Sequence, residues 1–313
     1  MHLYQGYPSA CEGSVIRHLA LGFFDGLHLG HRSVILNPHS LNHLEQTAVL
    51  TFWPHPMTVL TGQKPPDLIT TLEEKTAILQ SWKIGHTAVL DFNNDMAMSS
   101  PEVFLDAIAV AFPNMVTLSV GPNFRFAHRR AGTPVTLADW CRERGVQFHL
   151  TDYMMDGATP ISSTRIRELL REGKLDEATR MMGHPYPLTG HVVRGEGNGR
   201  HIGFPTANFS LAKTCLLPDG VYLAEWIDAQ AIAHPVALNI GFRPTLGKHQ
   251  TRSVEAHVID FHSDLYGQHL QLQVLKFLRA EQKFPDVEAL KDQIRRDVET
   301  CRERYDSWRS VKE

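Results

Sequence analysis

Between residues 190 and 208 the chain carries a run of glycines that could hold phosphate. Gly195, Gly197 and Gly199 fall within five positions, so the backbone there can approach a ligand and turn its N–H groups toward phosphate oxygens. Arg200 occupies the place of the third glycine of the dinucleotide fingerprint, and no Gly-Lys-Ser/Thr follows, which excludes both that motif and a Walker loop. A glycine-rich hairpin turn that holds no ligand fits the same residues.

A compact polar turn, residues 205–208, follows this loop. Thr206 and Asn208 are two positions apart, and in an extended segment that spacing puts a hydroxyl and an amide oxygen on one face. Both are hard oxygen ligands that suit a magnesium ion already held by nucleotide phosphates. The pair therefore predicts a site for magnesium with a nucleotide.

Two histidines follow the first predicted strand, residues 15–21. His28 and His31 are three positions apart in a turn that contains Gly22 and Gly26, and they project from the same side if the turn is helical. A helix N-terminus attracts anions, and glycines let the backbone close on them, so the pair could donate hydrogen bonds to ATP phosphates. Two surface histidines beside a turn would show the same spacing.

Hydroxyl side chains gather again at the start of another predicted helix. Ser162, Ser163 and Thr164 open this helix, which continues through Arg167. Serine and threonine are good N-caps, and the same end of a helix also favours phosphate. Taken alone, these hydroxyls are explained by capping.

Glu255 is the candidate base in the second half of the chain. It lies in a predicted strand, where Val254 and Ala256 point one way and Glu255 and His257 point the other. A carboxylate in the mouth of a barrel can act as a general base. A solvated or ion-paired carboxylate fits the isolated position as well.

Alternating strands and helices must position the N-terminal candidates. This alternation predicts a parallel sheet with helices on both faces, whose ligands bind at the carboxyl ends of strands. The expected strands are residues 15–21, 48–52, 87–92, 115–121 and 146–151. The expected helices are residues 72–82 behind the capping box Thr71–Glu74, a helix capped by Ser99 that runs to residue 112, and residues 135–144. Candidate segments 24–31, 52–56 and 123–125 lie just past three strand ends.

The second half has an all-β pattern, and a closed Greek-key barrel is expected. Its strand-like segments are residues 190–194, 220–228, 236–240, 254–261 and 270–278. From residue 286 onward apolar side chains recur every three or four positions, which predicts an amphipathic helix docked on the barrel. Before the barrel, Leu175–Met182 is a predicted short helix, and residues 183–187, with two prolines and a glycine, are the expected domain joint.

Composition sets the broad class. The chain has 313 residues, enough for two domains with their own cores. A net charge of −3 argues against nucleic-acid binding as the main function. Four dispersed cysteines predict free thiols in a reducing cytoplasm. The sequence contains no apolar run of 18 residues, so no membrane span is expected. The 18 histidines are scattered, so no metal centre built from histidines is expected.

Two longer motifs carry a family resemblance. Residues 24–31 resemble the FDGxHxGH motif of nucleotidyltransferases, and residues 203–208, GFPTAN, resemble the signature of riboflavin kinases. Residues 161–167 resemble the motif ISSTxIR, and residues 120–125 resemble the flavin-side motif of FMN adenylyltransferases. Together the chain resembles the prokaryotic bifunctional riboflavin kinase/FAD synthetases. The resemblance implies a Rossmann-like FMN adenylyltransferase domain at residues 1–186 and a flavokinase barrel with a terminal helix at residues 187–313.

The resemblance also implies roles for single residues, with ATP, riboflavin and FMN as ligands. Glu255 would be the kinase base, Thr206 and Asn208 would bind Mg²⁺ with ATP, and FMN and FAD would be substrate and product, not prosthetic groups. In the adenylyltransferase half, ATP would meet Phe24, Asp25, Gly26, His28, His31, Ser162, Ser163, Thr164 and Arg167, and flavin would meet Phe52, Pro56, Asn123, Phe124 and Arg125. In the kinase half, ATP phosphates would meet Gly195, Gly197, Gly199, Arg200, Thr206 and Asn208, and flavin would meet Arg279 and Phe284.

Three residues depart from the family pattern. Ala127 replaces a glycine and would be strained at positive φ, Pro38 should end the helix after His31 early, and Trp53 stands where the family usually has a polar or acidic residue. These departures leave open a riboflavin kinase with an impaired adenylyltransferase half. A flavin-binding regulator without catalysis is the alternative from another class, although it would need no magnesium ligands. A monomer or weak homo-oligomer is expected.

Overall fold

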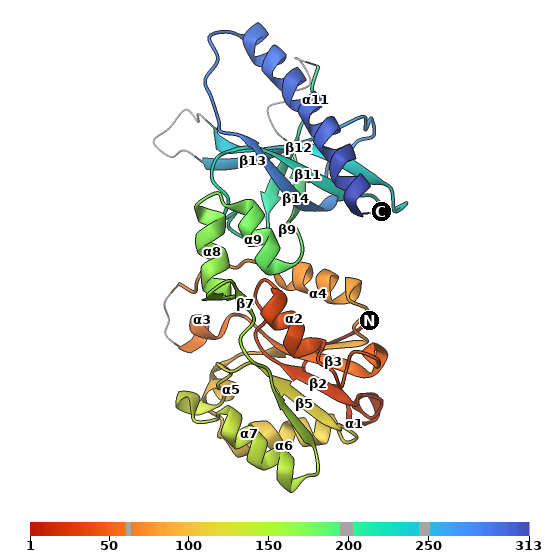
Figure 1. Cartoon of the computed structure of the whole chain (residues 1–313), viewed down its shortest axis with the longest axis vertical. Helices are drawn as coiled ribbons and strands as arrows, with labels where there is room; N and C mark the ends of the chain where they lie inside the picture. The colour runs from red at the N-terminus through yellow and green to blue at the C-terminus, as the bar shows by residue number, and fades with distance from the viewer. Residues whose placement is uncertain (61–63, 195–202, 244–250, 313) are drawn as a thin grey trace. The chain divides into compact units, whose positions relative to one another are not determined.

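The computed structural model describes residues 1–60, 64–194, 203–243 and 251–312 (Figure 1). The chain forms two compact units, Met1–Ser163 and Thr164–Glu313. The division falls earlier than the boundary between residues 186 and 187 that the sequence suggests, because α9 (Leu175–Met182) packs on strands β9 and β14 of the second unit. In the expected joint, Tyr186 already belongs to β9 and is buried. The assignment of one activity to each side of residue 186 stays a prediction.

The first unit contains a six-stranded parallel sheet, as expected. The neighbouring strands β3, β2 and β5 place the segments that follow them, residues 54–56, 22–31 and 121–125, at one edge of this sheet. Strand β1 is an edge strand that the sequence did not predict. The strands are, in sheet order, β1 (His2–Gln5), β4 (His86–Asp91), β3 (Thr47–Trp53), β2 (His18–Leu21), β5 (Thr117–Val120) and β6 (Gln147–Leu150).

Helices cover both faces of this sheet (Figure 1). Leu19 and Leu21 of β2 point into a core shared with α6 (Pro101–Ala111) and α7 (Pro134–Glu143). Ala20 points the other way, into a core shared with α2 (Leu29–Ile35) and α4 (Leu72–Ser81). The period of two along a strand thus produces two apolar layers.

The helix boundaries test the capping predictions. The Thr71–Glu74 capping box is present at the start of α4. The prediction for Ser99 is wrong, because Ser100 caps α6 and Pro101 takes the first helical position, where its missing N–H costs nothing. Helix α2 ends at Ile35, before Pro38, as expected.

Shorter elements complete the first unit, and α8 begins at its boundary with the second. They are α1 (Ala10–Gly13), η1 (Leu44–Gln46), α3 (Pro56–Leu60), α5 (Asn94–Met98), η2 (His128–Arg130), the hairpin β7 (Met155–Asp156) with β8 (Thr159–Pro160), and α8 (Ser163–Arg171).

The second unit is built around a closed antiparallel barrel. Its strands close in the order β10-β13-β12-β11-β14-β9, and the chain skips between neighbours from β10 to β11 and from β13 to β14, which is the expected Greek-key pattern. Residues 207 and 208 belong to β10, so the predicted polar turn at 205–208 is wrong in its second half. The strands are β9 (Tyr186–Val193), β10 (Ala207–Leu211), β11 (Gly220–Ile227), β12 (Ala233–Arg243), β13 (Thr251–Val258) and β14 (His269–Arg279).

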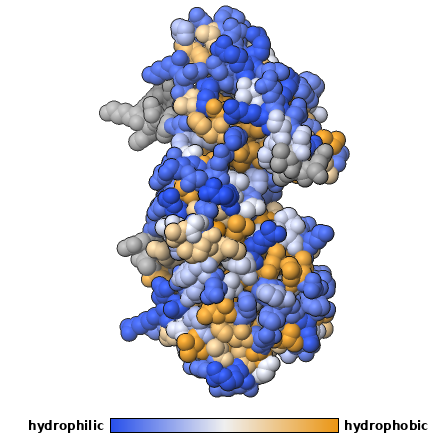
Figure 2. Space-filling model, viewed as in Figure 1, coloured by the Kyte–Doolittle hydropathy of each residue, from blue (hydrophilic) through white to orange (hydrophobic). Residues whose placement is uncertain are grey.

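The predicted terminal helix is α11 (Val287–Lys312), and it packs on the outside of the barrel. Leu223 and Leu275 on the outer face meet Val298, Cys301 and Tyr305 of this helix in one buried cluster. Elsewhere apolar side chains reach the surface in separate places, as the viewed face in Figure 2 shows. Scattered exposure of this kind is normal for a folded protein and points to no ligand.

Candidate active sites

The turn between β2 and α2 has a strained backbone that only a fixed surrounding can hold. Phe24 has φ 54°, and Gly26 and Leu27 have φ 81° and 39°. Left-handed values at two residues that are not glycine cost free energy and cluster at functional sites. The amide of Gly26 donates to the Thr70 hydroxyl at 2.9 Å, which ties this turn to the chain before α4.

The two histidines of the turn lie together, as predicted. The rings of His28 and His31 stack with centroids 3.6 Å apart, and Phe24 packs edge-on against His31 at 5.3 Å. His28 is the N-cap of α2, because its Nδ1 accepts the amide of His31 at 3.2 Å. A neutral ring that accepts at Nδ1 carries its proton on Nε2, which makes Nε2 the hydrogen-bond donor of this ring.

Asp25 is held inside the turn by hydrogen bonds to the chain before α4. Its buried carboxylate accepts hydrogen bonds from the amides of Ile69 and Thr70 at 3.0 to 3.2 Å. The hydroxyl of Ser163 donates to the Asp25 carbonyl at 2.9 Å. These bonds assign Asp25 and Ser163 to holding the turn in shape, and their direct contact with ATP stays a prediction. Thr164 and Arg167 belong to the second unit, so their contact with ATP also stays a prediction.

Sequence reasoning missed Lys75, which lies beneath this turn. Its side chain is 1% exposed, and the ammonium donates to the carbonyl of Phe23 and to the hydroxyl of Thr51. The missed signal is spacing, because Leu72, Lys75 and Leu79 recur at the helical period that marks a buried face.

The predicted flavin-side residues of the first unit divide into two groups. Phe52 is buried in the sheet core against Phe92 and Phe104, which gives it a packing role. Asn123 lies past the end of β5, where its side-chain oxygen accepts the hydroxyl of Tyr153 at 2.6 Å. The other predicted residues interact with near neighbours in the sequence. Pro56 opens α3, Phe124 stacks on Phe126, and the exposed Arg125 donates to the carbonyls of residues 122 and 124.

Ala127 has the positive φ at which a residue other than glycine is expected to be strained. It has φ 65° and ψ 179°, a region that is essentially reserved for glycine. The residue lies four positions after Asn123 and packs against the sheet core. The methyl group of Ala127 thus makes the backbone conformation of the flavin-side loop unfavourable.

In the barrel, Glu255 pairs with both neighbouring strands. It lies opposite Asn208 of β10 and Asn239 of β12, so these three side chains form a row on one face. The buried Val254 and Ala256 point to the barrel interior, as the alternation predicted, which puts Glu255 on the outer face rather than in the mouth of the barrel.

Asn208 offers a direct test of whether these residues suit a metal ion. Its Oδ1 is buried and accepts no hydrogen bond from any residue that the structure describes. A buried carbonyl oxygen without a partner is costly, and a hard cation would satisfy it. Asn208 with Thr206 therefore fits Mg²⁺, while the described part of the chain contains no cluster of three His, Cys, Asp or Glu able to hold a metal ion.

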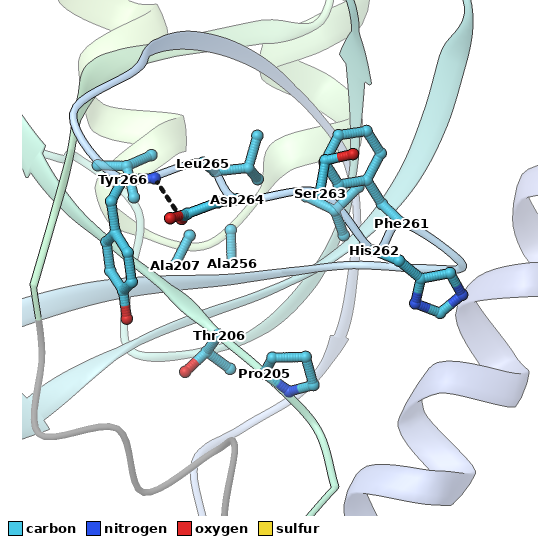
Figure 3. Close-up of a pocket in the computed structure, with 12 residues that line it drawn as sticks. Pro205, Thr206, Ala207, Ala256, Phe261, His262, Ser263, Asp264, Leu265 and Tyr266 are labelled. Atoms are coloured by element: carbon cyan, nitrogen blue, oxygen red, sulfur yellow. Dashed lines mark hydrogen bonds between the residues drawn. The ribbon is translucent and has the colours of Figure 1, made fainter.

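A cavity of about 320 Å³ opens beside Thr206 (Figure 3). Ala207 and Ala256 form part of its wall, and the segment from Phe261 to Tyr266 covers it. In that segment, the amide of Tyr266 donates to the carboxylate of Asp264 at 3.0 Å. The cavity is the right size for part of a nucleotide, and its small alanine side chains leave room for a flat ring.

The structure describes only some of the remaining predicted kinase residues. Arg279 forms a bidentate ion pair with Asp297 of α11, with distances of 2.7 and 2.9 Å, and lies 5.9 Å from the ring of Phe284. This pairing commits its guanidinium to holding α11 on the barrel, and contact of Arg279 or Phe284 with flavin stays a prediction. Gly195, Gly197, Gly199 and Arg200 lie outside the described residues.

Comparison with known proteins accounts for both halves of the chain. Residues 12–165 match the family model described as FAD synthetase, and residues 182–305 match the one described as riboflavin kinase. A bifunctional riboflavin kinase/FMN adenylyltransferase of Listeria monocytogenes is 34% identical, with 91% of each chain covered. The enzyme of the same name from Escherichia coli is also 34% identical, with 93% of each covered.

The chain belongs to the bifunctional riboflavin kinase/FMN adenylyltransferase family. It is therefore a transferase, and the fold and family predicted from its motifs are confirmed.

The fold also occurs in solved structures. A protein of Streptococcus pneumoniae named as a macrolide-efflux protein superposes with a TM-score of 0.78, at 28% identity, covering 92% of this chain and 94% of that one. In the described part of the present chain, no helix is both long and apolar enough to cross a membrane.

Proposed function

We propose that the chain makes FAD from riboflavin in two steps, with the barrel phosphorylating riboflavin and the parallel-sheet unit adenylylating the FMN. The observation that carries the proposal is the register of β10 against β13. It sets Glu255 opposite Asn208, whose buried side-chain oxygen has no partner among the described residues. A base beside a metal ligand is what phosphoryl transfer to a hydroxyl requires. A binder without catalysis would need neither.

In the kinase step, Glu255 takes the proton of the riboflavin 5′-hydroxyl. The oxygen attacks the γ-phosphorus of ATP, the new O–P bond forms, and the bond to the β,γ-bridging oxygen breaks to release ADP. The cavity that Thr206 lines holds part of this ATP. When bound, Mg²⁺ would neutralise charge on the phosphates. Thr206 and Asn208 are its protein ligands in this proposal.

In the adenylyltransfer step, a phosphate oxygen of FMN attacks the α-phosphorus of a second ATP and pyrophosphate leaves. The nucleophile needs no base, since its second pKa is about 6 and it is already largely a dianion at neutral pH. His28 donates from Nε2, and His31 is held beside it by the ring stack. Their work is positioning and charge stabilisation at the phosphates.

Because of the strain at Ala127, we expect FAD formation to be slower than FMN formation. The residue's glycine-type backbone lies in the flavin-side loop of the adenylyltransferase unit, and the other two departures from the family pattern, Pro38 and Trp53, lie in the same unit. We also place the enzyme in a reducing cytoplasm, because all four cysteines are free thiols. We expect a monomer or weak homo-oligomer that has no nucleic-acid partner.

Separate removal of the two activities tests the proposal. Glu255→Gln keeps the size and hydrogen bonding of the side chain but removes the base, so FMN formation should fall about 10²- to 10⁴-fold while FAD formation from added FMN persists. Glu288→Gln, at an exposed site on α11, is the matched control. Normal kinase activity in Glu255→Gln would show that the base lies elsewhere.

The histidine variant must preserve the helix cap that His28 supplies. Asparagine is a good N-cap, so the double variant His28→Asn, His31→Ala removes both rings without uncapping α2. It should lose FAD formation from FMN and keep riboflavin phosphorylation. His43→Ala, at an exposed histidine of the same unit, is the control, and a double variant with the parent rate of FAD formation would refute the assignment.

A further inference from the structure

Lys75 is a buried cation with uncharged partners. Its described contacts are the carbonyl of Phe23, the hydroxyl of Thr51 at 3.2 Å, and the face of the Phe23 ring, whose centroid is 4.3 Å from Nζ. The Asp25 carboxylate acts on it electrostatically from the same turn. Burying a charge is costly unless something compensates it, and the contacts of Lys75 provide only partial compensation.

These contacts place the ammonium under two strand ends at once. Phe23 follows β2 and precedes the strained residue Phe24, and Thr51 lies near the end of β3. The Thr51 hydroxyl also donates to the Phe23 carbonyl at 3.0 Å. Lysine, threonine and carbonyl therefore form a closed triangle that joins the turn carrying His28 to the strand that leads to Pro56.

We propose that Lys75 is a positioning residue for adenylyl transfer: it fixes the turn after β2 against the end of β3 and supplies buried positive charge to the phosphates bound there. The inference rests on the adenylyltransferase function proposed above. In this view the protein tolerates a poorly compensated cation because the missing negative charge arrives with ATP and FMN.

The electrostatic setting supports this role. Desolvation lowers the pKa of Lys75 to about 8, and the Asp25 carboxylate opposes part of that shift. The other ionisable neighbours are Glu74, the preceding residue on α4, and His55, whose ring meets Phe23 edge-on at 4.4 Å. At neutral pH the amine is mostly charged, and approaching phosphates would favour that form further.

The variant Lys75→Met separates this role from a structural one. Methionine is unbranched and of similar length, and the Phe23 carbonyl keeps its bond from Thr51. The Thr51 oxygen loses the ammonium donor, but its hydroxyl still donates to that carbonyl. Replacement of a buried charge by an apolar side chain is often neutral or stabilising. A residue needed only for folding would give the opposite result.

We expect Lys75→Met to unfold at no lower temperature than the parent protein and to phosphorylate riboflavin at the parent rate. Its kcat for FAD formation, with both substrates saturating, should fall about 10- to 100-fold because the reacting groups are misplaced. Lys83→Met, at an exposed lysine just after the same helix, should leave all three measurements unchanged. The parent kcat in Lys75→Met, counted per folded molecule, would overturn the inference.

A second measurement needs no variant and remains available if Lys75→Met fails to fold. In the parent protein, kcat/KM for FAD formation should fall as pH rises through about 8 to 9, where Lys75 loses its proton, while riboflavin phosphorylation shows no such fall. A flat profile from pH 7 to 9.5 would contradict the inference. If the parent protein makes no FAD at any pH, the proposed function fails instead.

Discussion

Replacement of Ala127 by glycine should make the first unit more stable. A residue at φ 65° and ψ 179° stores about 1–3 kcal/mol of backbone strain, and glycine releases it. Glycine gives back about 0.4–1 kcal/mol through the greater entropy of the unfolded chain, and some packing of the methyl on the core is lost. The net expectation is a gain of about 1 kcal/mol, which corresponds to a rise of about 2–4 °C in Tm for a unit of this size.

Denaturant unfolding and initial rates of FAD formation would be measured for Ala127→Gly and for Ala131→Gly. Ala131 lies in the same loop with φ −63° and ψ −31°, an ordinary helical backbone, so glycine there should be neutral or slightly destabilising. Ala127→Gly should also form FAD faster, since the loop that carries Asn123 relaxes. The reasoning is refuted if Ala127→Gly is no more stable than Ala131→Gly.

Three further predictions concern pH, metal and relative rates. Because burial lowers the pKa of Lys75, the unfolded state binds more protons than the folded state between pH 8 and 10.5, so the free energy of unfolding should rise by up to about 3 kcal/mol across that window. Denaturant titrations should show this rise in the parent protein and not in Lys75→Met. The kinase should need Mg²⁺ or Mn²⁺ with nucleotide and bind no metal tightly without it, because the Thr206 and Asn208 side chains offer only oxygen; stoichiometric zinc in the purified protein by elemental analysis would contradict this. With saturating ATP, FMN should form faster than FAD, and equal rates by chromatography would remove the argument from Ala127.

The parts of the fold that sequence predicts well are those with a local physical signal. The strands of the parallel sheet form apolar runs, and the Thr71–Glu74 capping box fixes the start of α4. The strain at Ala127 was also predictable, since any side chain is strained at a position where glycine has a positive φ. In each case a few neighbouring residues determine the outcome.

The elements that were missed depend on distant partners. Strand β1 has four residues and becomes a strand only through its pairing with β4. Asn208 has low strand propensity, yet β9 and β13 on either side draw it into β10. Tertiary pairing decided both positions against local composition.

Side-chain roles were hardest to predict where a charge is buried. The sequence did not predict that the Asp25 carboxylate binds the amides of Ile69 and Thr70, and its contact with ATP stays a prediction. The sequence did not predict that Arg279 pairs with Asp297, 18 positions later on α11, and its contact with flavin stays a prediction. Lys75 was missed because a helical lysine usually extends into solvent. Each outcome depends on a contact that no local pattern encodes.

The most direct test of the central claim follows labelled phosphate from ATP into product. The protein would be incubated with riboflavin, Mg²⁺ and ATP labelled at either the γ- or the α-phosphorus, and the flavins would be separated by chromatography. Two activities in one chain predict γ-label in both FMN and FAD, and α-label in FAD alone. γ-Label confined to FMN, with no labelled FAD, would contradict the adenylyltransferase half, and unlabelled flavin throughout would contradict both.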